Sequence, residues 1–207
     1  MRIAEKTIEL NFCAQLNSTA KQHLIWFGLT QRQEAQLGFD ACTSIGGRLL
    51  ILQFKASNYR LKSGHRRFYA SHAQMMLLKK LAKRPRSVFY VLPTVGTTRE
   101  LAARPDLIAH SRLLDITSIP ASMPPPTQGR SSVLRKTGVH YVDVAPSGLA
   151  TIHSDPVQVQ TLLAKEFFSQ GLPDAGNVLG RFEDNFAQFW EFRRAFARNA
   201  LGLVVAN

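Results

Sequence analysis

Cysteine is scarce in this 207-residue chain, which has only two, Cys13 and Cys42. Two distant thiols supply neither a disulfide framework nor the paired spacing of a zinc module, so we expect both to stay reduced in a cytoplasmic protein. No apolar run approaches the ~18 residues that a membrane-spanning helix needs. The first ten residues, MRIAEKTIEL, carry acids where the apolar core of a secretory signal would lie, so we expect no such signal.

Acidic residues are absent from residues 41–99, although this window holds twelve of the basic ones. The formal net charge of the whole chain is +12. A field of this kind attracts polyanions, and nucleic acid is the first candidate; a solvated basic surface, or one that docks on an acidic protein, is the alternative. The basic residues that we expect to contact nucleic acid are Arg60, Lys62, Arg66, Arg67, Lys79 and Lys80.

Common cofactor and metalloprotease motifs are also missing. The chain has no HExxH, no GxxxxGK[ST] and no GxGxxG. These absences leave the charge distribution and the local patterns of polar residues as the guides to function.

The first 120 residues alternate between helical and extended patterns. Apolar spacing predicts helices in the segments 3–17 and 68–84, and Thr30, Gln33 and Gly38 cap a short helix between them. Residues 39–56 form a predicted hairpin around Gly46-Gly47. The other expected elements are a basic loop at 58–67, a buried strand at 87–93, an irregular to helical stretch at 97–110 and a short strand at 112–119. Helices that connect apolar strands predict an α/β class with a mixed sheet.

The rest of the chain is expected to form a separate part. We predict an α/β domain over residues 1–120, a proline-rich linker over 121–137 and a C-terminal extension over 138–207. The extension is expected to contain a hairpin across Pro146-Ser147-Gly148 and two helices, at 157–170 and 179–200. The last of these carries six aromatic residues between 182 and 196, which predicts burial against its own domain and against a second copy or a partner chain.

The hairpin carries an unusual set of polar residues. Gln53 and Lys55 are two positions apart, so they share one face of an otherwise apolar strand. A buried lysine is costly unless it is paired, and Asp40 on the neighbouring strand is the nearest acid. A plain Asp40–Lys55 ion pair would explain this pattern. A carboxylate, an amide oxygen and a lysine are also what metal-assisted phosphodiester hydrolysis uses.

Asp40, followed after twelve residues by Gln53-Phe54-Lys55, resembles the PD-(D/E)xK nuclease superfamily, which is also called restriction-endonuclease-like. Glutamine replaces the first acid of the (D/E)xK motif, as it tends to in the Mrr-like branch, and Gly38-Phe39-Asp40 is similar to that branch as well. The resemblance covers residues 5–92, and at most residues up to 120. It implies a restriction-endonuclease-like mixed sheet flanked by helices, here followed by the C-terminal hairpin and two-helix extension.

The resemblance also implies a function. Asp40 and Gln53 would hold Mg²⁺ or Mn²⁺, and Lys55 would act on the phosphate or the attacking water. The family adds an acid from a preceding helix: Glu34 is favoured because it is close to Asp40 in sequence, and Glu9 on the longer first helix is the alternative. We therefore expect a metal-dependent endonuclease, acting on DNA rather than RNA, with defence against foreign DNA as one setting. Because glutamine carries no charge, a weak or inactive nuclease fold that binds nucleic acid or a partner protein is the other reading.

Overall fold

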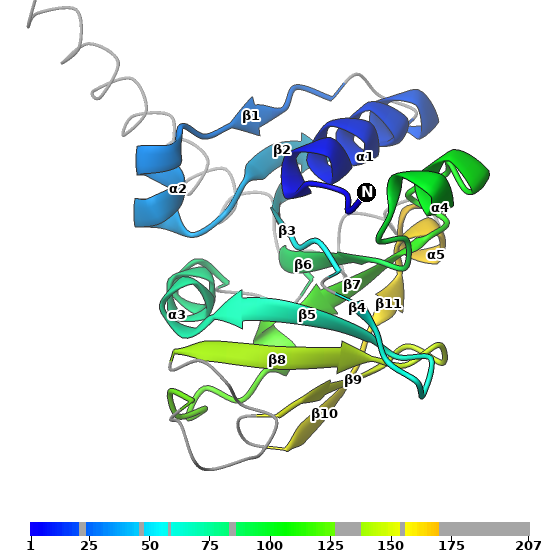
Figure 1. Ribbon diagram of the computed structural model, residues 1–207. Coiled ribbons are helices and arrows are strands. Elements are labelled where there is room, and N and C mark those ends of the chain that lie inside the picture. Colours follow the sequence, from blue (N-terminus) through cyan, green and yellow to red (C-terminus); the bar gives the residue numbers. More distant parts are fainter. Residues whose placement is uncertain are drawn as a thin grey trace, which may run out of the picture.

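The computed structural model describes residues 1–20, 24–45, 48–57, 59–82, 86–126, 138–153 and 156–169. Within these ranges the chain forms two sheets and several short helices (Figure 1). The expected α/β class, with a mixed sheet flanked by helices, is confirmed. The proposed linker from residue 127 onward, the tight turn at 46–47 and the aromatic helix at 179–200 lie outside the described residues.

The first sheet contains the predicted hairpin and has six strands in the order β1-β2-β3-β6-β7-β11. The hairpin strands β2 and β3 are antiparallel, with Ala41 opposite Leu52 and Ile45 opposite Arg48. The pairing of β3 with β6 is parallel, and the other pairings in this sheet are antiparallel. The strands are β1 (Phe27–Gly28), β2 (Ala41–Ile45), β3 (Arg48–Phe54), β6 (Val88–Pro93), β7 (Ser111–Asp115) and β11 (Leu162–Leu163).

The second sheet joins segments from the two sides of residues 127–137. Its order is β10-β9-β8-β5-β4, and all its pairings are antiparallel. Strand β5 pairs along its whole length with β8, and β8 forms the predicted second hairpin with β9. The strands are β4 (Tyr59–Arg60), β5 (Arg66–Ser71), β8 (Val139–Val144), β9 (Leu149–Ile152) and β10 (Val157–Gln160).

The residues that cap the short helix α2 at both ends are the ones that the sequence predicts. Thr30 and Gln33 form a reciprocal capping box at its start, and Gly38 ends it with a φ of 82°. A Cβ at Gly38 would also lie 3.0 Å from the Cβ of Leu77, so both the backbone angle and the space require glycine. The helices are α1 (Glu5–Thr19), α2 (Gln31–Leu37), α3 (His72–Leu81), α4 (Thr98–Ala103) and α5 (Ala164–Ser169), with a 3₁₀ turn at Ile116–Ser118. Within the described residues, every helix is too short or too polar to span a bilayer.

Two predicted helices and one predicted loop need correction. The helix expected over 68–84 begins only at His72, because Phe68 and Ala70 are buried alternately in β5, which pairs with β8. The basic stretch 58–67 contributes β4 and the start of β5 rather than a loop. The helix expected over 157–170 begins at Ala164. Residues 157–160 alternate apolar and polar with a period of two, which suits strand β10.

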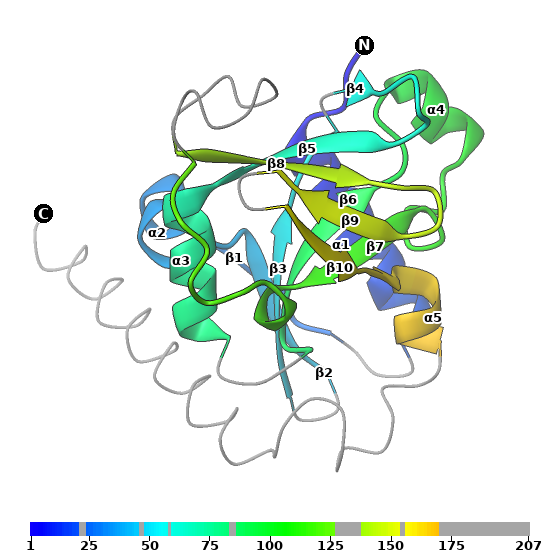
Figure 2. The ribbon, with the colours of Figure 1, turned by 90° about the horizontal axis from the view of Figure 1, so that it is seen from below.

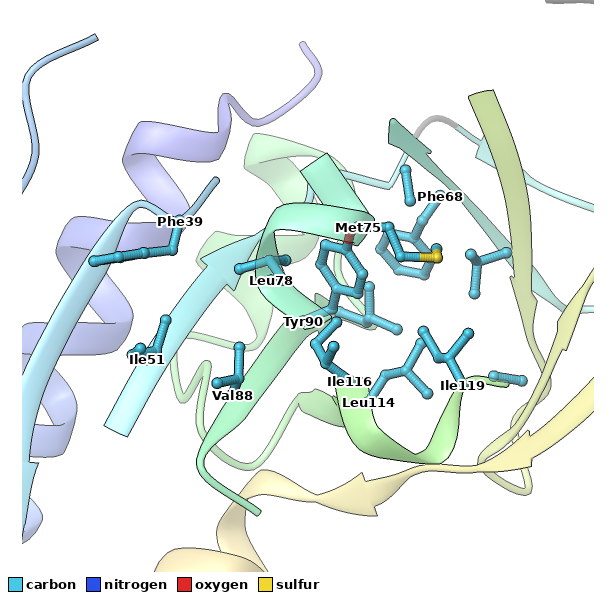
Figure 3. Packing of buried hydrophobic residues seen from close by; sticks show 14 of the residues in the cluster. Phe39, Ile51, Phe68, Met75, Leu78, Val88, Tyr90, Leu114, Ile116 and Ile119 are labelled. Carbon is cyan, nitrogen blue, oxygen red and sulfur yellow. The ribbon is translucent and has the colours of Figure 1, made fainter. Parts of the chain in front are cut away.

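The fold has three layers, with the first sheet in the middle (Figures 1 and 2). A core cluster between the two sheets includes Ile51 and Tyr90 from the first sheet, Phe68 from the second, and Met75 from α3 (Figure 3). A second cluster lies on the opposite face of the first sheet, where α1 packs against alternate residues of β3. Strand β3 is therefore covered on both faces, which explains its nearly continuous apolar sequence.

The packing of α1 gives a direct test of this arrangement. Phe12 is fully buried, and its ring meets that of Phe54 edge to face at 5.6 Å between centroids. We predict that Phe12→Ala lowers the free energy of unfolding by about 3–5 kcal/mol. Leu10 belongs to the same helix but is 60% exposed, so Leu10→Ala should cost less than about 0.5 kcal/mol. Urea denaturation of both variants tests this; equal losses would contradict the packing of α1.

Candidate functional site

Asp40 ties the start of β2 to the end of β3. Its backbone N–H donates to the carbonyl of Leu52 at 3.2 Å. Its carboxylate Oδ2 accepts hydrogen bonds from the backbone N–H of Phe54 at 2.7 Å and from Nε2 of Gln53 at 2.8 Å. Asp40 and Gln53, two of the residues singled out from the sequence, are thus in direct contact.

The amide of Gln53 is buried, and among the described residues only its nitrogen has hydrogen-bond partners. Its side chain is 1% exposed, and Nε2 donates both to Asp40 and to the backbone carbonyl of Phe54 at 3.1 Å. Both partners are acceptors, so the orientation of the amide is fixed by its contacts. Oε1 consequently lies in the interior with no hydrogen-bond partner among the described residues. An orphaned buried acceptor is costly, so this oxygen is available to a ligand.

Lys55 is also buried, at 8% exposure, and follows directly after β3. Within the described residues its ammonium forms no ion pair closer than 4.0 Å, so the simple Asp40–Lys55 ion pair is not formed. Its Nζ lies 5.9 Å from the centroid of the Tyr90 ring, a cation–π contact. The ammonium still acts on Asp40 electrostatically.

Tyr90 and Glu5 also lie near Asp40, although no sequence pattern predicts them as site residues. Tyr90 lies opposite Gln53 in the parallel pairing of β3 and β6, and its buried hydroxyl has no partner among the described residues. Burial and the charge of Asp40 raise the pKa of Tyr90. Glu5, on the first turn of α1, accepts a hydrogen bond from the backbone N–H of Ala56 at 3.1 Å. Only the strand register and the docking of α1, both long-range features, could have identified them.

The two helix acids proposed from the sequence both lie near Lys6. Glu9 is buried and accepts a hydrogen bond from Lys6 Nζ at 2.7 Å. The hydrogen bond that Lys6 donates to Glu9, together with the charges of Glu34 and Asp40, raises the pKa of Lys6. Neither glutamate bonds to Asp40, so the choice between Glu9 and Glu34 as the additional acid stays open.

Burial sets the protonation of Asp40. Desolvation raises its pKa from 3.8 to about 6, although the Phe54 N–H and the Lys55 ammonium act in the opposite direction. Among the described residues, no three of His, Cys, Asp or Glu gather into a group that could hold a metal ion. The oxygen donors at this point are one carboxylate and one amide, so the site has fewer charges than an all-acid metal centre.

The predicted nucleic-acid contacts fall into two groups. Arg60, Lys62 and Lys80 are exposed, and they lie on β4, in the turn after it and on α3. The Lys79 ammonium, also on α3, donates to the backbone carbonyl of Pro120. The exposed members are placed to meet solvent or a ligand.

Arg66 and Arg67 instead make contacts within the protein. Arg66 pairs with Glu100 at 2.7 Å. Arg67 is buried: Nε and Nη2 donate to both carboxylate oxygens of Asp143, at 2.6 and 2.5 Å, and Nη1 donates to the Tyr59 hydroxyl at 2.9 Å. With all three of its nitrogens engaged, Arg67 holds the second sheet together.

Comparison of the chain with protein-family models, with curated protein sequences and with solved structures finds no match. The grounds for a functional assignment are therefore the sequence pattern and the geometry around Asp40.

The raised pKa of Asp40 predicts a pH-dependent stability difference. Because the carboxyl binds its proton more tightly in the folded state, its contribution to stability is present below pH 4 and is lost as the pH rises through 6. Asp40→Asn cannot ionise and keeps an oxygen for the Phe54 N–H. We predict that its stability relative to wild type rises by about 2–3 kcal/mol between pH 4 and pH 7.5.

Urea denaturation of both proteins across this range measures the effect. Other titrating groups, including Asp143, are common to the two proteins and cancel in the difference. A stability difference that does not change with pH would mean that Asp40 is ordinarily solvated.

Proposed function

We propose that this chain is a metal-dependent phosphodiesterase with a restriction-endonuclease-like core, acting on nucleic acid and on DNA in particular. The observation that carries the proposal is the pair of buried groups beside Asp40: among the described residues, the Lys55 ammonium forms no ion pair and Gln53 Oε1 has no hydrogen-bond partner. A protein gains no stability from keeping a lysine and an amide oxygen unsatisfied in its interior. Such groups are retained where they bind a ligand.

The donors fit a hard divalent cation. The second carboxylate oxygen of Asp40 makes no hydrogen bond within the described residues, and Gln53 offers the orphaned Oε1. Carboxylate and amide oxygens are the protein ligands that Mg²⁺ and Mn²⁺ take. When bound, the ion would polarise a phosphate and make a water molecule more acidic. Glu9 or Glu34 would then supply a further carboxylate.

Other residues of the chain would stabilise the transition state and attract the substrate. Lys55 would stabilise the negative charge that develops on the phosphate, and its burial strengthens that interaction because little water screens it. The exposed Arg60, Lys62 and Lys80 would attract the nucleic-acid backbone. The acid-free stretch from 41 to 99 surrounds the site in sequence, so few carboxylates would repel the substrate there.

A second candidate is a nuclease fold that binds nucleic acid without cleaving it. Two observations favour it: glutamine replaces a charged ligand, and no cluster of three metal-binding side chains forms among the described residues. A weaker cation site would lower or abolish cleavage while leaving the basic surface intact.

Cleavage of plasmid DNA with Mg²⁺ or Mn²⁺ separates the two candidates. We predict metal-dependent nicking that falls about 100-fold or more in Lys55→Met and Asp40→Asn. Lys165→Met removes the same charge from an exposed position on α5 that has no proposed role and should change the rate less than about threefold. Lys55→Met should keep or increase stability, because it removes a buried charge that forms no ion pair with any described residue.

The nuclease assignment would fail if wild-type protein bound DNA but did not nick it with either metal, and the binding-only candidate would then stand. Nicking that survived in both Asp40→Asn and Lys55→Met would show that the activity arises elsewhere.

A further inference from the structure

A pocket of about 330 Å³ lies at the end of the two sheets that is opposite α3. Its walls come from the β4–β5 turn, the β8–β9 turn, the end of β6 and the start of β7. The two turns are at the right of Figure 1. Pockets of this size hold small molecules.

The polar lining of the pocket is strongly cationic. None of the lining residues is an aspartate or a glutamate. Glu100, which pairs with Arg66 from outside the lining, reduces the formal charge of the four guanidinium groups to about +3. The polar side chains that line the pocket are Arg60, Arg66, Arg104, Arg112, His110, Ser111 and Thr94.

Two of the guanidinium groups are fixed in place. Arg66 is held by Glu100, and Glu100 also accepts a hydrogen bond from the backbone N–H of Gly96 at 2.7 Å. Arg112 donates to the carbonyl of Pro146 at 2.9 Å. Both groups lie against glycine: a Cβ at Gly96 would come within 2.7 Å of Arg66 Nη1, and a Cβ at Gly148 would collide with Arg112. Prepositioned donors of this kind lose little freedom when they bind an anion.

The other two guanidinium groups, those of Arg60 and Arg104, are not held by contacts with the described residues. Within the described residues, Arg60 and Arg104 make no side-chain hydrogen bond or ion pair. Planar guanidinium groups bind phosphate oxygens with two parallel hydrogen bonds, which suits them to phosphate monoesters and diphosphates.

Ser111 provides an independent sign of a ligand. This pocket-lining residue is 1% exposed, and its hydroxyl has no partner among the described residues. A serine hydroxyl can both donate and accept, so leaving it unsatisfied in the interior is costly unless a ligand engages it. Phe68, Leu92 and Pro146 add an apolar wall next to these polar groups.

We propose that this pocket binds a small phosphorylated molecule, with its phosphoryl group on the arginines and Ser111 and its less polar part against Phe68, Leu92 and Pro146. A ligand with two or three negative charges, such as a nucleoside monophosphate or a diphosphate, balances the charge of the pocket. The pocket is recessed between the sheets, its walls including side chains of the inter-sheet core. A nucleic-acid backbone would instead meet the exposed Lys62 and Lys80, which lie outside the pocket lining.

The site is distinct from the Asp40 centre. None of Asp40, Gln53 or Lys55 lines the pocket. Ser57, two residues beyond Lys55, and Arg66, which lines the pocket, both approach Gly96: a Cβ at Gly96 would be 3.5 Å from the Cβ of Ser57 and 2.7 Å from Arg66 Nη1. The two sites are therefore neighbours joined by a short segment of backbone.

Isothermal titration calorimetry of the full chain with inorganic phosphate, pyrophosphate and AMP at ~100 mM NaCl tests the proposal. We expect saturable binding of at least one of them with one site per chain.

Arg104→Gln and Arg60→Gln should each weaken binding about tenfold or more, and Ser111→Ala should weaken it severalfold without loss of stability. Arg99→Gln removes the same charge from an exposed position on α4 outside the pocket and should change affinity less than about twofold. Asp40→Asn should bind as wild type does, whatever its effect on cleavage.

Three results would overturn the proposal. The first is no saturable binding of any of the three anions up to ~5 mM. The second is an equal loss in Arg99→Gln and Arg104→Gln, which would show diffuse attraction rather than a site. The third concerns a 12-nucleotide DNA measured by fluorescence anisotropy: if AMP displaces it and Arg104→Gln weakens both ligands equally, the pocket holds backbone phosphates of nucleic acid.

Discussion

The geometry around the candidate site depends on one half-buried carboxylate, that of Asp40. Asp40 accepts hydrogen bonds from the backbone of Phe54 and the side chain of Gln53, so it fixes the end of β3 against the start of β2. This arrangement holds the Gln53 amide in one orientation and leaves its Oε1 without a hydrogen-bond partner among the described residues. It also places Lys55 close enough for its charge to act on the carboxyl. Burial opposes ionisation of Asp40, and the bonds from β3 only partly offset that cost.

Unsatisfied polar atoms mark both places where we propose ligands. Three of the buried orphan atoms in the described residues are Gln53 Oε1, the Tyr90 hydroxyl and the Ser111 hydroxyl. The first two accompany Asp40, and the third lines the arginine pocket. The fourth orphan atom, the Ser57 hydroxyl, belongs to a residue that lies against Gly96. The other fully buried side-chain polar atoms of the described residues are paired, as the Arg67–Asp143 contact illustrates. The difference between paired and unpaired buried polar groups is a physical reason to distinguish residues that stabilise the fold from residues that we propose bind a ligand.

Local signals in the sequence predicted the parts of the fold that local chemistry controls. The hairpin and the capped helix α2 depend on residues a few positions apart, and both were predicted correctly. Strand β5 was partly mistaken for a helix because its pairing partner, β8, lies about 70 residues further along the chain. The contact of Asp40 with Gln53 followed from the motif spacing. The arginine pocket could not be foreseen, because its walls come from separate turns and strands that only the folded topology brings together.

Direct titration of the Asp40 carboxyl is the measurement that tests this account most closely. The ¹³C chemical shift of its carboxyl carbon, assigned by comparison with Asp40→Asn, can be followed against pH with and without Mg²⁺. The structure predicts an apparent pKa of about 6 in the absence of metal. A cation held by Asp40 and Gln53 would favour the ionised form and lower that pKa by at least about one unit. A pKa near 4 without metal, or one that saturating Mg²⁺ leaves unchanged, would contradict the account.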